Sequence, residues 1–274
     1  MMKIAALGPK GTYCDIACQN YLNENNLDYE IVYYPSILKT ALSISENDFA
    51  ILPFENTLDG FVMESLDQII NSNLHIIKQL KLNIDFAFVT NAKAIEDVEK
   101  CYVQFKAYGQ CLDFISSNKF SISQTQSNTQ SLERLLESND KCGAIIPVHL
   151  LENNSFNLVI NHIADSTHNE TRFFVISKEN IQNEIYDIAN ISIVITAIED
   201  RSGILFDILK EFHYLDINLK AIMSRPMKTE MGKYKFYIEC SLDKNNLDKL
   251  DKLIKQLETQ NHFKVNVLGA YNEI

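Results

Sequence analysis

Apolar and polar positions alternate along the first third of the chain in a regular rhythm. Short apolar runs predict strands, and stretches with apolar positions three or four residues apart predict helices between them. The expected strands are 3–8, 29–34 and 49–54, and the expected helices are 12–22, 36–45 and 61–70. This βαβαβα order is typical of a mostly parallel sheet with helices on both faces.

The same rhythm then repeats. Residues 75–89 are long enough for one or two strands or for a ribbon that crosses between two bodies. Further strands are expected at 101–105, 121–125 and 143–146, helices at 109–116 and 130–137, and returning segments at 157–163 and 171–176. Two consecutive α/β sets predict two lobes, and a ligand is expected where strand ends and helix starts of both lobes converge.

A polar stretch at 177–187 separates this part from a different pattern. Strands at 191–198, 217–223, 234–240 and 263–268 and helices at 203–212 and 247–257 give the order βαββαβ. This order predicts a ferredoxin-like unit. The pattern therefore predicts a two-lobed domain at 1–180, with lobe 1 at about 1–76 and 160–180 and lobe 2 at about 77–159, and a second domain at 188–274.

Composition sets outer limits on the kind of protein. The 274 residues, 46% of them hydrophobic, suit about two domains. No secretory leader and no apolar run of the roughly 20 residues that a membrane span needs is visible. Six scattered cysteines without a CxxC pair suggest reduced thiols in the cytoplasm, although Cys14 and Cys18 are spaced as half of a metal site.

The net charge of −11 argues against a nucleic-acid partner. It also means that the electric field of the whole molecule would not attract an anionic substrate. Such a substrate would need a local positive potential, which helix N-termini and backbone N–H groups can supply.

Three polar motifs stand at strand ends or starts. Gly8 to Cys14 joins a strand to a helix, with Thr12 as a candidate helix cap, and its spacing is not that of a P-loop. Pro53 to Gly60 also leads from a strand end into a helix start. Asn169 to Ile176 is a polar cluster followed by a strand. Each motif alone also has an ordinary structural interpretation: a capped turn for the first, a polar turn closed by Gly60 for the second and a strand-start threonine for the third.

Together the three motifs resemble the prephenate dehydratase family, which has a GPxGTF/YS-like opening, a P-x-E-N-S/T…G turn and an N-x-T-R-F motif in this order. The C-terminal unit resembles an ACT domain, since Gly203–Phe206 is similar to its GALV-type motif. The resemblance implies an α/β fold with a two-lobed, periplasmic-binding-protein-like catalytic domain and a βαββαβ ACT domain. It implies conversion of prephenate to phenylpyruvate without a cofactor or metal.

The resemblance also implies roles for individual residues. Catalytic roles fall to Thr171, Asn56, Glu55 and Gln110, and substrate binding to Thr12, Cys14, Thr57, Thr129, Arg172 and Phe173. Phenylalanine is the implied effector, bound between two copies in a homodimer or homotetramer. Its expected site consists of Gly203, Ile204, Leu205, Phe206, Asn218, Leu219, Ser224, Arg225 and Pro226.

Three positions depart from the family pattern. Cys14 stands where serine is usual, Gln104–Lys106 replace Ser-His-Pro, and Met223 replaces a glutamate of the ACT segment. These changes bear on substrate contacts and on effector binding. A cytosolic, non-catalytic sensor of aromatic ligands on the same two-lobed scaffold is the alternative function.

In the expected mechanism, Thr171 donates a hydrogen bond to the departing ring oxygen. Asn56 and Gln110 orient the substrate, and Glu55 orients neighbouring donors. Arg172 either supplies the counter-charge or pairs structurally with an acidic side chain, because it is next to Thr171 on a strand and can face away from it.

Overall fold

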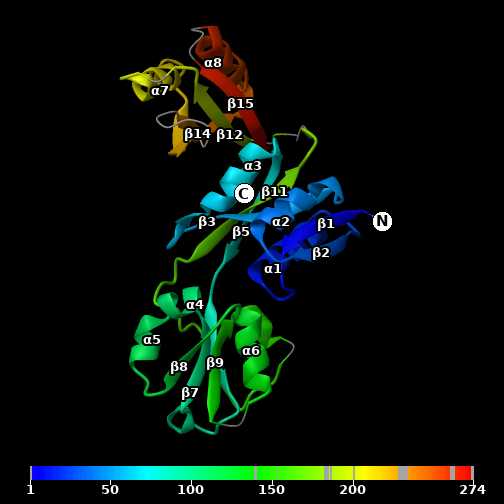
Figure 1. The fold of residues 1–274 in the computed structure, drawn as a ribbon, viewed down its shortest axis with the longest axis vertical. Helices are drawn as coiled ribbons and strands as arrows, with labels where there is room; N and C mark the ends of the chain where they lie inside the picture. The colour runs from blue at the N-terminus through cyan, green and yellow to red at the C-terminus, as the bar shows by residue number, and fades with distance from the viewer. Residues whose placement is uncertain are drawn as a thin grey trace.

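The computed structural model describes residues 2–138, 141–152, 154–181, 185, 187–199, 201–227, 234–259 and 263–272. Three bodies lie along the long axis of the molecule (Figure 1), with the first lobe in the middle, the second lobe at one end and the C-terminal domain at the other. None of the helices in these ranges is both long and apolar enough to cross a membrane.

The first lobe is built on a sheet with the strand order β2-β1-β3-β11-β5, and β4 pairs with β3 at its edge. Its strands are β1 (Lys3–Leu7), β2 (Glu30–Tyr34), β3 (Phe49–Asn56), β4 (Gly60–Phe61), β5 (His75–Asn83) and β11 (Glu170–Ser177). Its helices are α1 (Tyr13–Glu24), α2 (Ile37–Leu42), the short 3₁₀ helix η1 (Ser43–Ser45) and α3 (Met63–Asn71). The β1, β2 and β3 strands are parallel, whereas β11 runs antiparallel to both β3 and β5.

The second lobe has a sheet with the order β10-β6-β9-β7-β8. Its strands are β6 (Phe86–Thr90), β7 (Lys100–Gln104), β8 (Ser121–Thr125), β9 (Cys142–Pro147) and β10 (Leu158–Ile160). Its helices are η2 (Ile95–Asp97), α4 (Phe105–Gln110), α5 (Leu112–Ser116), α6 (Asn128–Leu136) and η3 (Val148–Leu151).

The chain crosses between the lobes at a different place from the one expected. β5 stays in the first sheet as far as Asn83 because it pairs with β11 along its length, so lobe 1 extends beyond residue 76. Tyr13 of α1 holds the segment between β5 and β6, where the chain passes from one lobe to the other. Its hydroxyl donates to the Asp85 carbonyl at 2.9 Å and accepts from the Asp85 N–H at 3.2 Å. The stretch expected as one or two strands or a ribbon is thus two strands, one in each lobe.

The C-terminal domain is a four-stranded antiparallel sheet with the order β13-β14-β12-β15 and two helices. Its elements are β12 (Ile188–Ala197), α7 (Ile204–Tyr214), β13 (Asn218–Pro226), β14 (Tyr234–Asp243), η4 (Lys244–Asn246), α8 (Asp248–Thr259) and β15 (Phe263–Asn272). This is the predicted ferredoxin-like order βαββαβ, and with the two α/β lobes it confirms the fold class. Of the linker expected at 177–187, residues 182–184 and 186 lie outside the described ranges.

The C-terminal domain docks on the first lobe through a shared apolar core. Tyr237 and Tyr271 of its sheet are completely buried in one cluster with Phe54 and Phe174 of the lobe. Gly269 of β15 makes this approach possible, because a Cβ added there would lie 2.0 Å from the carbonyl oxygen of Ile76 in β5. Arg225 of β13 adds a two-bonded ion pair to Asp67 of α3, with distances of 3.0 and 2.7 Å.

Candidate active site

A cavity of about 410 Å³ lies between the two lobes. The first lobe lines it with the β1–α1 turn, the β3–β4 turn and the start of β11, and the second lobe with α4 and the β8–α6 turn. Six of the residues expected to act on substrate line it: Thr12, Cys14, Asn56, Gln110, Thr171 and Phe173.

A bulge between β3 and β11 decides which side chains face the cavity. Arg172 pairs with Glu55 but Phe173 pairs with Pro53, so β3 carries one extra residue, Phe54. Because of this shift, Pro53 and Asn56 both line the cavity, while Phe54 packs in the core shared with the C-terminal domain. On β11, ordinary alternation places Thr171 and Phe173 on the cavity side.

Asn56 is the centre of the polar network in the cavity wall. Its side-chain oxygen accepts from the N–H groups of Leu58 and Asp59, at 3.0 Å each, and these donors fix the orientation of the amide. Its NH₂ group therefore points at oxygens, with the Thr171 Oγ1 atom at 3.0 Å and the Asn169 Oδ1 atom at 2.8 Å. Since the Thr171 oxygen accepts this hydrogen bond, the threonine keeps its own hydroxyl hydrogen for a bond into the cavity.

A hydrogen-bonded chain of amides continues from Asn56 into the second lobe. The Asn169 NH₂ group donates to the Gln110 Oε1 atom at 3.0 Å. Asn169 is 2% exposed and is the first residue of the N-x-T-R-F motif, so that motif contributes a connecting residue as well as the threonine. The position of Gln110 is thus tied to that of Thr171 across the lobe boundary.

Several N–H groups of the β1–α1 and β3–β4 turns already have hydrogen-bond partners within the protein. The Gly11 N–H donates to the buried Asp15 carboxylate at 2.7 Å, and Thr12 caps α1 by accepting from the Asp15 N–H at 3.4 Å. In the second turn, the N–H groups of Leu58 and Asp59 go to Asn56, as described above. Among the described residues of the first α1 turn, Tyr13 and Cys14 are left with N–H groups for a ligand.

Cys14 lines the cavity as a protonated thiol. Burial, followed by the charge of Asp15, raises the pKa of Cys14 to about 12 from an ordinary value of 9.0. Cys14 and Cys18 both pack in the apolar core beneath α1. In the described parts of the chain, no group of three or more His, Cys, Asp and Glu side chains is arranged to hold a metal ion.

Glu55 and Arg172 do not line the cavity. Arg172 points to the opposite face of the sheet, where its guanidinium contacts Glu55 at 2.8 Å and Glu239 of the C-terminal domain at 2.7 and 2.9 Å. Burial on its own would lower the pKa of Arg172, but its hydrogen bond with Glu239 and the charges of Glu239 and Glu55 outweigh burial and raise it. Of the two roles expected for Arg172, the structure shows the structural ion pair.

Thr57 and Thr129 lie beside the cavity and not in its lining. The Thr57 hydroxyl donates to the His168 carbonyl and accepts from the Glu170 N–H, at 3.0 Å each. These bonds connect the β3–β4 turn to the segment just before β11. Thr129 of α6 stands against Gly11 across the lobe boundary, where an added glycine Cβ would lie 2.9 Å from its methyl group. Sequence reasoning missed Asn169, Asp59 and Lys106, although all three belong to motifs that it examined.

Two pockets lie on the C-terminal domain, at different ends of its helix α7. A pocket of about 240 Å³ is lined by Gly203, Ile204 and Leu205 together with Tyr234 and Phe236 of β14. Gly203 has a φ of +85° and has nothing within 4 Å of where its Cβ would be, so a ligand can approach the backbone there. Phe206, the fourth residue of that motif, is 69% exposed.

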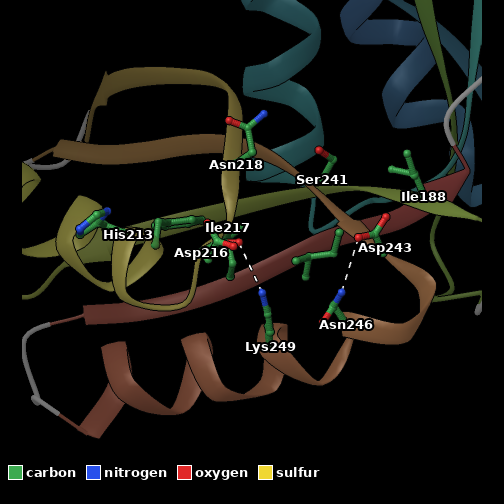
Figure 2. A pocket seen from close by; sticks show the side chains of 11 residues that line it. Ile188, His213, Asp216, Ile217, Asn218, Ser241, Asp243, Asn246 and Lys249 are labelled. Atoms are coloured by element: carbon green, nitrogen blue, oxygen red, sulfur yellow. Dashed lines mark hydrogen bonds between the residues drawn. The ribbon is translucent and has the colours of Figure 1, made fainter.

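The second pocket, of about 470 Å³, contains Asn218 (Figure 2). Asp216 and Asp243 flank it, with Lys249 of α8 reaching the Asp216 carbonyl at 3.5 Å. The remaining expected effector residues lie elsewhere: Leu219 packs on the domain core, Arg225 holds Asp67, and Ser224 and Pro226 lie opposite Phe236 and Tyr234 in the sheet.

Two α/β lobes around a polar cavity, with a ferredoxin-like domain docked on one of them, define a class of two-lobed proteins that enclose a small molecule. The sequence pattern of the prephenate dehydratase family matches residues 4–181, which is more than half of the chain. The chain belongs to the prephenate dehydratase family. Its function is accordingly prephenate dehydration, a lyase activity of phenylalanine biosynthesis.

Individual relatives agree with this assignment. The prephenate dehydratase of Methanocaldococcus jannaschii is 31% identical over 265 residues, covering 96% of this chain and 95% of that protein. The crystal structure of the prephenate dehydratase from Staphylococcus aureus matches with a TM-score of 0.84 and 28% identity, covering 99% of this chain and all of that one. A prephenate dehydratase from Arthrobacter aurescens in complex with L-Phe shares the fold, with a TM-score of 0.82 and 22% identity over 99% and 90% of the two chains.

Proposed function

We propose that prephenate binds in the interlobe cavity and that Thr171 assists the departure of its ring hydroxyl. In this reaction the ring carboxylate leaves as carbon dioxide, and its bonding electron pair makes the ring aromatic as the hydroxyl leaves. The hydroxide takes up a proton and becomes water. Aromatisation supplies the driving force, so the protein has to hold two carboxylates and stabilise charge on one departing oxygen.

The observation that carries this proposal is the hydrogen bond that the Thr171 Oγ1 atom accepts from Asn56. The Asn56 amide donates to Oγ1 at 3.0 Å, which leaves the hydroxyl hydrogen as the donor toward the cavity. Threonine is too weak an acid for full proton transfer. A hydrogen bond that strengthens as charge develops on the leaving oxygen is the effect expected instead.

Asn56 and Gln110 act as positioning groups in this proposal. Both line the cavity, and Asn169 links them, so the two lobes present a connected polar wall to the substrate. Glu55 acts only indirectly, because its carboxylate is bonded to Arg172 on the far face of the sheet. The N-termini of α1 and α6 both border the cavity and contribute positive potential for the carboxylates.

The test is direct. Purified protein is mixed with prephenate at neutral pH without added cofactor, and phenylpyruvate is followed by its absorbance in alkali. Formation of product at a rate far above that of prephenate alone supports the proposal. Binding of prephenate without product would favour the alternative function, a non-catalytic sensor.

Phenylalanine is the proposed effector, bound between the C-terminal domains of two copies. The pocket at Gly203 is open to an approaching ligand, Asn218 borders a pocket at the other end of α7, and a relative of the same fold binds L-Phe. Turnover should therefore change when phenylalanine is added, and Gly203→Val should remove this response while leaving turnover without phenylalanine intact. Equal turnover at saturating phenylalanine would leave the domain with a structural role only.

A further inference from the structure

The cavity has to hold a dianion, yet its charge pattern offers little to attract one. The whole chain carries a net charge of −11, and Arg172, the cation of the T-R-F motif, is held by Glu55 and Glu239 away from the cavity. Among the described residues that line the cavity, two are charged, Asp59 and Lys106. Lys106 is therefore the cation available to a substrate carboxylate.

Lys106 and Asp59 face each other from different lobes. The Lys106 Nζ atom lies 3.1 Å from the Asp59 Oδ2 atom, and their side chains are 61% and 38% exposed. Lys106 belongs to α4 of the second lobe, whereas Asp59 lies in the β3–β4 turn of the first. An ion pair that is this exposed contributes little to stability, so it exchanges readily for another anion.

The backbone of Lys106 is fixed even though its ammonium group is exposed. The Gln104 side chain caps α4 by accepting from the N–H groups of Lys106 at 2.8 Å and Ala107 at 3.3 Å. Asp59 is held in turn by the hydrogen bond from its N–H to Asn56. Asp59 is thus bonded to the network that holds Thr171, and Lys106 lies on the same helix, α4, as Gln110 of that network.

We propose that Lys106 binds a carboxylate of the substrate, and that Asp59 is the ion-pair partner of Lys106 that this carboxylate replaces. This inference rests on the proposed function and adds a residue to it. A lysine ammonium has three donors, so it can turn from the aspartate toward the incoming carboxylate.

Lys106 and Asp59 have opposite effects on substrate binding. Lys106 attracts the dianion, whereas Asp59 repels it and competes with it for the ammonium group. Removing the lysine charge should weaken binding, and removing the aspartate charge should strengthen it. If the Lys106–Asp59 ion pair served only to hold the lobes together, removing either charge would break it equally. Both variants would then change the substrate affinity in the same direction.

The experiment compares steady-state kinetics of the wild type with Lys106→Met, Lys106→Arg and Asp59→Asn. A charge-assisted hydrogen bond corresponds to a rise in KM of about 10- to 100-fold for Lys106→Met, with kcat changed by less than about threefold. Lys106→Arg should restore most of the affinity, and Asp59→Asn should lower KM. Lys119→Met is the matched control, because Lys119 is exposed on the same lobe and outside the cavity lining.

Salt gives an independent readout. KM of the wild type should rise with ionic strength, and this dependence should be weaker in Lys106→Met. An unchanged KM in Lys106→Met, or equal shifts in Lys106→Met and Asp59→Asn, would overturn the proposal. If the wild type bound prephenate without turning it over, the proposed function would fail separately, and Kd values from calorimetry on the same variants would still decide the role of Lys106.

Discussion

At the scale of single residues, the orientation of one amide determines which hydrogen bonds the Thr171 hydroxyl can make. Two backbone N–H groups of the β3–β4 turn face the Asn56 oxygen, so its NH₂ group faces Thr171 and Asn169. An aspartate at position 56 could not donate these bonds. The asparagine of the P-x-E-N motif thus sets the direction of the Thr171 hydroxyl, although it need not touch the departing oxygen.

Asn169 offers a test of this network at a position outside the cavity lining. Asn169→Ala should lower kcat about tenfold or more, because it removes the hydrogen bonds that link Asn56 to Gln110, at a cost of about 1–3 kcal/mol. Steady-state kinetics with prephenate measure the effect. Asn157→Ala, which changes an exposed asparagine of the second lobe, is the control; wild-type kcat in Asn169→Ala would show that the chain of amides has no catalytic role.

The buried thiols predict how stability depends on pH. Burial raises the pKa of both Cys14 and Cys111 to about 12, from an ordinary value of 9.0. The folded state therefore binds these protons more tightly than the unfolded chain, so the stability they contribute is complete below about pH 9 and is lost as the pH rises toward about 12.

Thermal unfolding between about pH 8 and about pH 10.5 measures this dependence. The melting temperature should fall with rising pH above about pH 9, and it should fall less steeply in Cys111→Ala than in the wild type. Equal slopes for the two proteins would contradict the assignment for Cys111.

The sequence predicts the cavity-facing residues better than it predicts the charged ones. Thr171, Asn56 and Gln110 belong to motifs with a recognisable order, and all three line the cavity. Glu55 and Arg172 belong to the same motifs but face the other way. Their direction depends on strand alternation, on a bulge and on a carboxylate from the C-terminal domain, and no local pattern shows where that distant carboxylate lies.

At the scale of elements, β3 and β11 each have two functional faces. One face carries Asn56 and Thr171 into the cavity, and the other carries Glu55, Arg172 and Phe174 toward the C-terminal domain. A strand that is buried on both faces cannot shift its register without disturbing both sites. The same two strands therefore join the interlobe cavity to the surface on which the C-terminal domain packs.

Most elements could be predicted from hydrophobic periodicity, and the exceptions have physical causes. The helix expected at 109–116 is two short helices, α4 and α5, which meet at Cys111. The Asp165 carboxylate accepts from the Leu112 and Asp113 N–H groups and so starts the second helix, and this partner lies far away in sequence. The lobe boundary differed for a similar reason, because the pairing of β5 with β11 is a long-range contact.

Gly269 tests the close approach of β15 to β5. Gly269→Ala would place a Cβ 2.0 Å from the Ile76 carbonyl oxygen. Because this oxygen belongs to the backbone of a paired strand, it cannot move away as the end of a flexible side chain could. We expect a destabilisation of about 1–3 kcal/mol or more, seen as a melting temperature several degrees lower.

Gly109→Ala is the control for this change, because nothing lies within 4 Å of its added Cβ and the position is helical. That variant should be at least as stable as the wild type. An unchanged melting temperature in Gly269→Ala would mean that the two domains are not packed as closely as described.

At the scale of the whole molecule, the first lobe is shared by two functions. It forms half of the cavity, and it carries the C-terminal domain through a common apolar core and two arginine–carboxylate pairs, Arg172–Glu239 and Arg225–Asp67. Arg172 directly follows Thr171 in β11. A change in the packing of the C-terminal domain on the first lobe would therefore act on the strand that bears Thr171, and this is a physical route by which the proposed effector would reach the cavity.

Glu239→Gln tests the buried ion pair. Glu239 is completely buried against Arg172, so removing its charge leaves the guanidinium without its main partner, at a cost of about 3–5 kcal/mol. The melting temperature should fall markedly, whereas Glu133→Gln on the exposed face of α6 should leave it unchanged. Replacing both partners by apolar residues, Arg172→Met with Glu239→Leu, should recover much of the lost stability. If Glu239→Gln alone were as stable as the wild type, the Arg172–Glu239 pair would not hold the domains together.

The central claim is that the Thr171 hydroxyl assists the departure of the ring oxygen, and kcat for prephenate in Thr171→Ala tests it most directly. Loss of a group that acts in the transition state typically lowers the rate by about 10²–10⁴, so kcat should fall by that factor while KM changes much less. Thr171→Ser, which keeps the hydroxyl, should retain much of the activity. Turnover at the wild-type rate in Thr171→Ala would contradict the account.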